Sequence, residues 1–222
     1  MDKEEEGATG RSFREFLREC LNLVNLLIFI YMFCAASFNY YLINFYLKYI
    51  PGNVNVNTIV ASVAEVVAHY ISGWLVLSLG TRTVLAIMFA LCGVAGVFLW
   101  AATALNSTAL VPAIVLAAKF GVSSGFCVLY MSTLQYFPAQ FMGSVFGVCN
   151  VSARFVTILA PMIAEAPDPT PEMVMITSCI LAAVFVRCLR TPRFKQGDTD
   201  EASAGANPTK KAVAAANTST TT

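Results

Sequence analysis

The sequence predicts an all-α membrane protein with six transmembrane helices, on the basis of its composition and of the length of its apolar runs. The chain of 222 residues is 57% hydrophobic and only 12% charged, with a mean hydropathy of +0.68. Soluble domains carry about 25% charged residues, so this chain has too few charges to cover a soluble surface. About 20 apolar residues are needed to cross a hydrocarbon core of about 30 Å. Six runs meet this length, at residues 21–47, 58–79, 83–104, 109–131, 143–164 and 172–190.

Three domains follow from this pattern. Residues 1–20 are charged, and we expect a cytoplasmic segment with a short helix at the membrane surface, or simply the solvated beginning of the first span. Residues 21–190 form the six-span bundle, in which Pro112 and Pro161 predict helix starts or kinks. Residues 191–222 have almost no apolar bulk, so we expect a disordered cytoplasmic tail.

The placement of the basic residues predicts the orientation. If the amino terminus is cytoplasmic, eleven of the 14 Lys and Arg residues fall on the inner side, and only Lys48 falls in an outer loop. Inner loops of membrane proteins are rich in Lys and Arg. Both termini of this integral, multi-pass membrane protein are therefore predicted to be cytoplasmic. The plasma membrane is its expected location.

Several classes of function are disfavoured. The net charge of +1 gives no reason to expect a nucleic-acid partner. The seven cysteines stand singly and there is one histidine, so neither a zinc site nor a disulfide framework is expected. We also expect no cofactor. An enzyme is not expected either, because no Ser–His, Asp–Asp or H-E-x-x-H arrangement is present.

Four ionisable residues lie in the interior of the predicted spans, away from their ends. Such residues are costly in hydrocarbon, by about 3 kcal/mol or more each, and usually face a cavity or a partner. Glu65 and His69 share a helical face at i and i+4, where they could hydrogen-bond, exchange a proton or form a structural pair. Lys119 and Arg154 could bind an anionic substrate group, or could form an internal ion pair with Glu65.

Aromatic residues in the first span offer a second kind of candidate. Tyr40 and Tyr41 follow Phe38 and Asn39 and could line a pocket that stacks on an organic ring or cation. Packing or anchoring at the membrane interface would explain the same cluster.

Two motifs in the second half of the chain carry a family resemblance. Ala118-Lys119-Phe120-Gly121 precedes Tyr130 and the run Leu134-Gln135-Tyr136-Phe137-Pro138-Ala139. In the next span Gly147-Val148 leads to Arg154 and Ala160-Pro161. In order and spacing, these runs resemble the second half of the organic cation and organic anion transporter family of the major facilitator superfamily. Earlier in the chain, Tyr40-Tyr41, Glu65 and Leu79-Gly80-Thr81-Arg82 resemble further motifs of the family.

The resemblance implies the carboxy-terminal six-helix half of a twelve-span carrier. It implies that Arg154, Lys119, Tyr40, Tyr41 and Gln135 bind or orient substrate, and that Gly80 and Arg82 belong to a gating loop. Gln135 stands where the family has an acidic residue, and Met142 where it has an arginine. In the inner loop, Thr81 and Thr83 interrupt the L-G-R-R-P turn of the family, so that Arg82 is its one basic residue here.

Two functions are therefore expected. The first is transport of small organic ions by alternating access, with half of the carrier present here. This half would contact membrane lipid and would work with a partner half or as a homo-oligomer. The second is a non-transporting membrane subunit, or truncated regulatory fragment, that pairs with a full-length relative.

Overall fold

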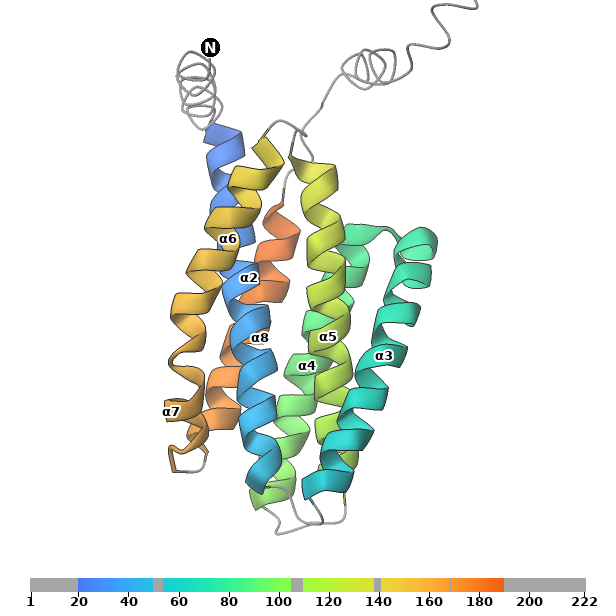
Figure 1. Ribbon diagram of the computed structural model, residues 1–222, viewed down its shortest axis with the longest axis vertical. Helices are drawn as coiled ribbons and strands as arrows, with labels where there is room; N and C mark the ends of the chain where they lie inside the picture. The colour runs from blue at the N-terminus through green and yellow to red at the C-terminus, as the bar shows by residue number, and fades with distance from the viewer. Residues whose placement is uncertain (1–19, 50–53, 105–109, 138–140, 168, 190–222) are drawn as a thin grey trace, which may run out of the picture. The chain divides into compact units, whose positions relative to one another are not determined.

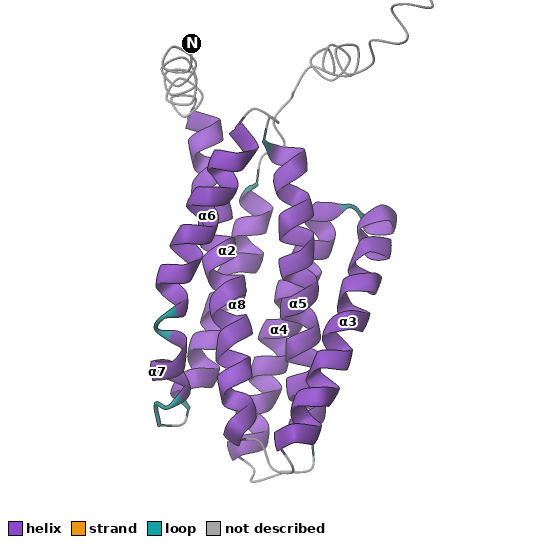
Figure 2. Cartoon of the chain, viewed as in Figure 1, coloured by secondary structure: helices purple, strands orange, loops and turns teal. Residues whose placement is uncertain are grey.

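The computed structural model describes residues 20–49, 54–104, 110–137, 141–167 and 169–189 (Figure 1). These residues form helices and short connections, without a strand (Figure 2). The amino-terminal segment and the tail lie outside the described residues, so both remain predictions. The elements are α2 (Cys20–Tyr46), the 3-10 turn η1 (Leu47–Tyr49), α3 (Val54–Leu79), α4 (Thr81–Ala104), α5 (Val111–Tyr136), α6 (Met142–Thr157), α7 (Ala160–Ala164) and α8 (Thr170–Cys188).

Six spans long and apolar enough to cross a membrane are present in the described part of the chain, with α6 and α7 together forming the fifth. The predicted all-α fold with six transmembrane helices is therefore confirmed. Most of α2 is buried, because it packs against α5, α6, α7 and α8. In contrast, little of α3 or of α6–α7 is buried. The helices α4 and α8 pack against each other and lie behind α2 and α5 in Figure 1.

Prolines explain two helix boundaries. A residue before proline is forced out of the helical conformation, and Phe137, which precedes Pro138, has extended angles of φ −127° and ψ 144°. As a result α5 continues to Tyr136, five residues beyond the predicted end of this span. Pro161 lacks an N–H and its ring crowds the carbonyl of residue i−4, which is Thr157, the last residue of α6. The predicted span 143–164 is thus divided into α6 and α7, as a kink at Pro161 predicts.

Gly80 is the single residue between α3 and α4. Its φ of +79° lies in the left-handed region, which glycine adopts without a steric penalty. Its N–H donates to the Val76 carbonyl at 3.0 Å, closing the end of α3. This geometry reverses the chain within one residue and places α3 and α4 as consecutive antiparallel spans.

Candidate functional site

Lys119 is the most deeply buried cation among the described residues. Its side chain on α5 is 2% exposed. The ammonium Nζ donates to Oδ1 of Asn44 at 2.8 Å and lies 3.5 Å from Oε2 of Glu65. It also lies 3.4 Å from the centroid of the Tyr40 ring, whose electron-rich face attracts cations. An amide oxygen, a carboxylate and an aromatic face from α2 and α3 therefore compensate one buried charge.

Besides Lys119, two further side chains, Tyr40 and His69, lie close to the Glu65 carboxylate. The Tyr40 hydroxyl donates to both carboxylate oxygens, at 2.9 and 3.2 Å. Nε2 of His69 lies 4.0 Å from Oε1, one turn along α3 as the i, i+4 spacing predicts. The side chains of Glu65 and His69 are 26% and 46% exposed, so this network opens on the surface along α3. Of the two cations considered as partners for Glu65, the described residues show Lys119 in that role and not Arg154.

Arg154 lies in the last turn of α6 and is exposed. Its Nη1 donates to the Tyr41 hydroxyl at 2.8 Å, and its guanidinium carbon lies 5.9 Å from the centroid of the same ring. The Tyr41 and Tyr40 rings are in edge contact, with centroids 5.5 Å apart. The adjacent tyrosines of α2 thus connect the buried Lys119 with the exposed Arg154.

A polar and aromatic group on α5 and α6 extends this region. Asn150 precedes Arg154 by one turn on the same face of α6, and its Oδ1 accepts a hydrogen bond from the Tyr130 hydroxyl at 2.9 Å. The Tyr130 ring stacks on Phe146 with centroids 5.6 Å apart and meets Phe126 edge-on at 5.1 Å. We define the candidate site by the residues of both groups, which are Tyr40, Tyr41, Asn44, Glu65, His69, Lys119, Tyr130, Asn150 and Arg154.

Gln135 does not join the candidate site. It follows Lys119 by 16 residues on α5, a distance of about 24 Å along a helix. Its Oε1 accepts a hydrogen bond from the Thr81 hydroxyl at 2.7 Å, which ties α5 to the beginning of α4. Its predicted role in substrate orientation therefore has no geometric support from the neighbouring residues.

Arg82 lies at the same end of the bundle as Gln135. Its Nε donates to the Val186 carbonyl at 3.1 Å, and its Nη2 donates to the Arg187 carbonyl. Both carbonyls belong to the last turn of α8, where four carbonyls of a helix lack an intrahelical partner. Gly80 and Arg82, the residues predicted to belong to a gating loop, thus form a junction between α3, α4 and the end of α8.

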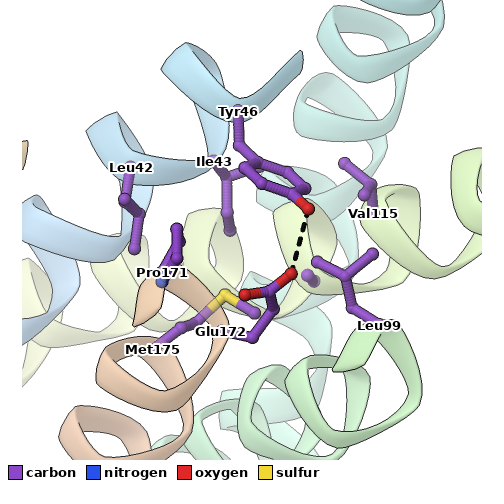
Figure 3. Close-up of a pocket in the computed structure, with 9 residues that line it drawn as sticks. Leu42, Ile43, Tyr46, Leu99, Val115, Pro171, Glu172 and Met175 are labelled. Atoms are coloured by element: carbon purple, nitrogen blue, oxygen red, sulfur yellow. Dashed lines mark hydrogen bonds between the residues drawn. The ribbon is translucent and has the colours of Figure 1, made fainter. Parts of the chain in front are cut away.

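Sequence reasoning missed a buried ionisable residue, Glu172. It lies in the first turn of α8, at the beginning of the predicted span. The structure buries it to 1% exposure, and Tyr46 of α2 donates to its Oε1 at 3.0 Å (Figure 3). Its Oε2 has no hydrogen-bond partner among the described residues, and Glu172 is one of the residues that line an apolar cavity of about 20 Å³.

Asn44 and Asn150 were also missed. Each lies within an apolar run, and the presence of a polar amide among apolar residues could have identified them from the sequence. The candidate site as a whole combines two cations, one carboxylate and several aromatic rings, which suits organic ions better than metals. Among the described residues there is no cluster of three or more metal-ligating side chains.

Comparison with known proteins supports a transport role. No known family profile matches the chain. A Caenorhabditis elegans protein named as a transporter is 23% identical over 198 residues, which make up 86% of this chain and 40% of that protein. Solute carrier family 22 member 4 of Mus musculus is 25% identical over 138 residues, which make up 59% of this chain and 23% of that protein. The chain spans less than half the length of these relatives.

Proposed function

We propose that this chain is one six-helix bundle of a carrier that moves small organic ions across a membrane by alternating access. The observation that carries the proposal is the buried Lys119, held by Glu65, Asn44 and the Tyr40 ring and connected through Tyr41 to the exposed Arg154. Ionisable groups within spans usually line a substrate path. The names of the two relatives support transport as the general role.

Arg154 is the proposed contact for an anionic substrate group. A guanidinium offers five N–H donors in a planar fork that matches a carboxylate. The contacts given for Arg154 are to the Tyr41 hydroxyl and ring, so its charge has no carboxylate partner among the described residues. A substrate carboxylate beside Tyr41 would supply that partner.

The tyrosines and Glu65 are the proposed contacts for a ring or a cationic group. Tyr40 and Tyr41 present two rings at 79° to each other, and aromatic faces attract organic cations. A substrate anion that reaches Lys119 would compete with Glu65, which is only 3.5 Å from the ammonium. Exchange of Glu65 for substrate is therefore the proposed step that couples binding to movement of α3.

The proposal includes a second bundle. In carriers built from repeats, substrate lies near the midplane between two halves, and one bundle supplies only one wall. The exposed surfaces of α3 and α6–α7 are where we propose that a partner half or a second copy of the chain docks. We further propose a plasma-membrane location with both termini cytoplasmic.

Uptake of radiolabelled organic ions tests the proposal. The full chain is reconstituted in liposomes, alone and with a full-length relative, and offered a monocarboxylate, a quaternary ammonium ion and a zwitterion. Saturable uptake that Lys119→Met abolishes is the expected result. Absence of uptake of every compound in both settings would refute it.

The subunit hypothesis gives a different result in the same experiment. It is supported by the inner turn around Arg82, where Thr81 stands in place of a basic residue of the family. If the chain only modulates a full-length relative, it alters the uptake by that relative, and Lys119→Met and Arg154→Ala leave this effect unchanged.

A further inference from the structure

A groove of about 420 Å³ lies between α4 and α8. Its walls are almost entirely apolar, with Ala90, Gly93 and Val97 on α4 and Ile180 and Val184 on α8. This volume falls within the range of about 300–1,000 Å³ of small-molecule sites. The groove exists because small residues on α4 face α8 at helical spacing.

The groove is separate from the candidate site. The site is built by α2, α3, α5 and α6, whereas α4 and α8 alone line the groove. In Figure 1, α4 and α8 lie behind α2 and α5. Val97, Ile180 and Val184 are large apolar side chains that remain exposed. In a membrane-spanning bundle such a surface contacts lipid hydrocarbon.

One end of the groove carries a positive charge. Arg187, in the last turn of α8, lines the groove and is exposed. Within the described part of the chain its guanidinium makes no hydrogen bond or ion pair. Its attraction to the carbonyl end of α8 is weakened because Arg82 already donates to the carbonyls of Val186 and Arg187. The Arg187 charge is therefore available to an external anion.

The length of the groove matches one leaflet. On α4 the lining runs from Ala86 to Val97, which is about 16 Å along a helix. Half of a hydrocarbon core of about 30 Å is about 15 Å. The charged end coincides with the beginning of α4 and the end of α8, where both helices reach the membrane surface.

We propose that this groove binds an anionic phospholipid, with an acyl chain along α4 and α8 and the phosphate at Arg187. Basic pockets between transmembrane helices bind anionic headgroups in this manner. The bound lipid bridges α4 and α8 on the surface opposite to substrate. On the predicted topology this is the cytoplasmic leaflet, which is rich in anionic lipids.

Lipid binding to the purified full chain tests the proposal. The chain in detergent is titrated with dioleoyl phosphatidylserine or dioleoyl phosphatidylcholine, and native mass spectrometry counts the bound lipids. We expect phosphatidylserine to bind in preference, with one molecule bound per chain at the lowest concentrations. Arg187→Gln should reduce this preference about fivefold, which corresponds to about 1 kcal/mol per basic side chain. Arg187→Lys should restore it.

Matched variants separate the groove from general effects. Ala90→Leu fills the groove and should weaken binding of both lipids. Ala113→Leu makes the same change at an exposed position of α5 and should have no effect. Lys48→Gln removes an exposed cation at the opposite end of the bundle and should also have no effect.

A second measurement needs no variant. Phosphatidylserine with a photoreactive group on its acyl chain should crosslink to peptides of α4 and α8. Crosslinks confined to α3 or α6, equal binding of the two lipids, or a fivefold loss with Lys48→Gln but not with Arg187→Gln would overturn the proposal.

Discussion

The ammonium of Lys119 lies 3.4 Å from the centroid of the Tyr40 ring, and the hydroxyl of the same tyrosine donates to Glu65. One side chain of α2 thus contacts both members of the ion pair between α5 and α3. Removing either charge should therefore affect the other through Tyr40 as well as directly.

A double-mutant cycle measures this coupling. Lys119→Met leaves Glu65 with the Tyr40 hydroxyl and the nearby His69, and we expect a loss of about 1–3 kcal/mol in the free energy of unfolding in mixed micelles. Because Glu65 is 26% exposed, water limits the loss. Adding Glu65→Gln should recover part of it, with a coupling energy of about 0.5–3 kcal/mol. Strictly additive single losses would show that the pair contributes nothing.

Arg154→Lys should lower organic-anion uptake at least tenfold in a competent assembly, or about 1.4 kcal/mol, while expression is unchanged. Lysine keeps the charge and loses the planar fork. Tyr41→Phe removes the hydroxyl that accepts from Arg154 and should have a smaller effect. Glu65→Gln should not rescue the stability of Arg154→Ala, since Glu65 pairs with Lys119. A rescue of stability would instead support the hypothesis that Arg154 forms an ion pair with Glu65.

Arg82→Ala should loosen the end of α8, because two carbonyls there lose their donor. We expect faster hydrogen exchange at residues 183–189 and a loss of about 0.3–2 kcal/mol in the free energy of unfolding. Arg187→Ala is the matched control, since that side chain makes no such bond in the described residues. Equal exchange rates in both variants would argue against a capping role for Arg82.

Tyr46→Phe and Glu172→Leu should have opposite consequences. The first leaves the buried Oε1 of Glu172 without its hydroxyl donor, and should cost about 1–3 kcal/mol of unfolding free energy. The second removes the carboxylate and puts an apolar group against the neighbouring Leu42 and Met175, and should be neutral or stabilising. Thermal unfolding of the single and double variants decides this. A large loss with Glu172→Leu would show that the carboxylate has a partner besides Tyr46.

Cysteine labelling tests the topology, in a background without native cysteines. A cysteine at Asn55, exposed in the first turn of α3, or at Asp168, outside the described residues, should react with an impermeant maleimide in intact cells. A cysteine at Thr83, exposed at the opposite end of the bundle, should react only after permeabilisation. The reverse pattern would invert the predicted orientation.

Most of the fold was predictable because the apolar runs set the number and the approximate limits of the spans. Individual ends were less predictable. Helix α5 continues past polar residues until Pro138 forces Phe137 out of the helix. Helix α3 begins at Val54, ahead of the predicted run, because polar residues at a membrane surface do not prevent a helix from starting there.

The ionisable residues of the candidate site could be picked out from the sequence one by one, but Asn44 and Asn150 were missed, and the pairing of the side chains could not be predicted. Hydropathy identifies Glu65, Lys119 and Arg154 as unusual, yet the rotation of each helix is set by packing. Only the structure shows that Glu65 faces Lys119 and that Tyr41 faces Arg154. Glu172 escaped notice because Tyr46, 126 residues earlier, covers it.

Gly80 gives α3 the properties of a lever. The space around Gly80, whose φ is +79°, is open, since a Cβ atom there would meet no atom within 4 Å. Helix α3 packs mainly against α5 rather than against α4. Glu65 lies 15 residues from this pivot, or about 22 Å along the helix. A swing of about 10° at Gly80 would carry the carboxylate about 4 Å, more than its 3.5 Å separation from the Lys119 ammonium. A small angular change at one end of the bundle is therefore enough to open and close the ion pair near its middle.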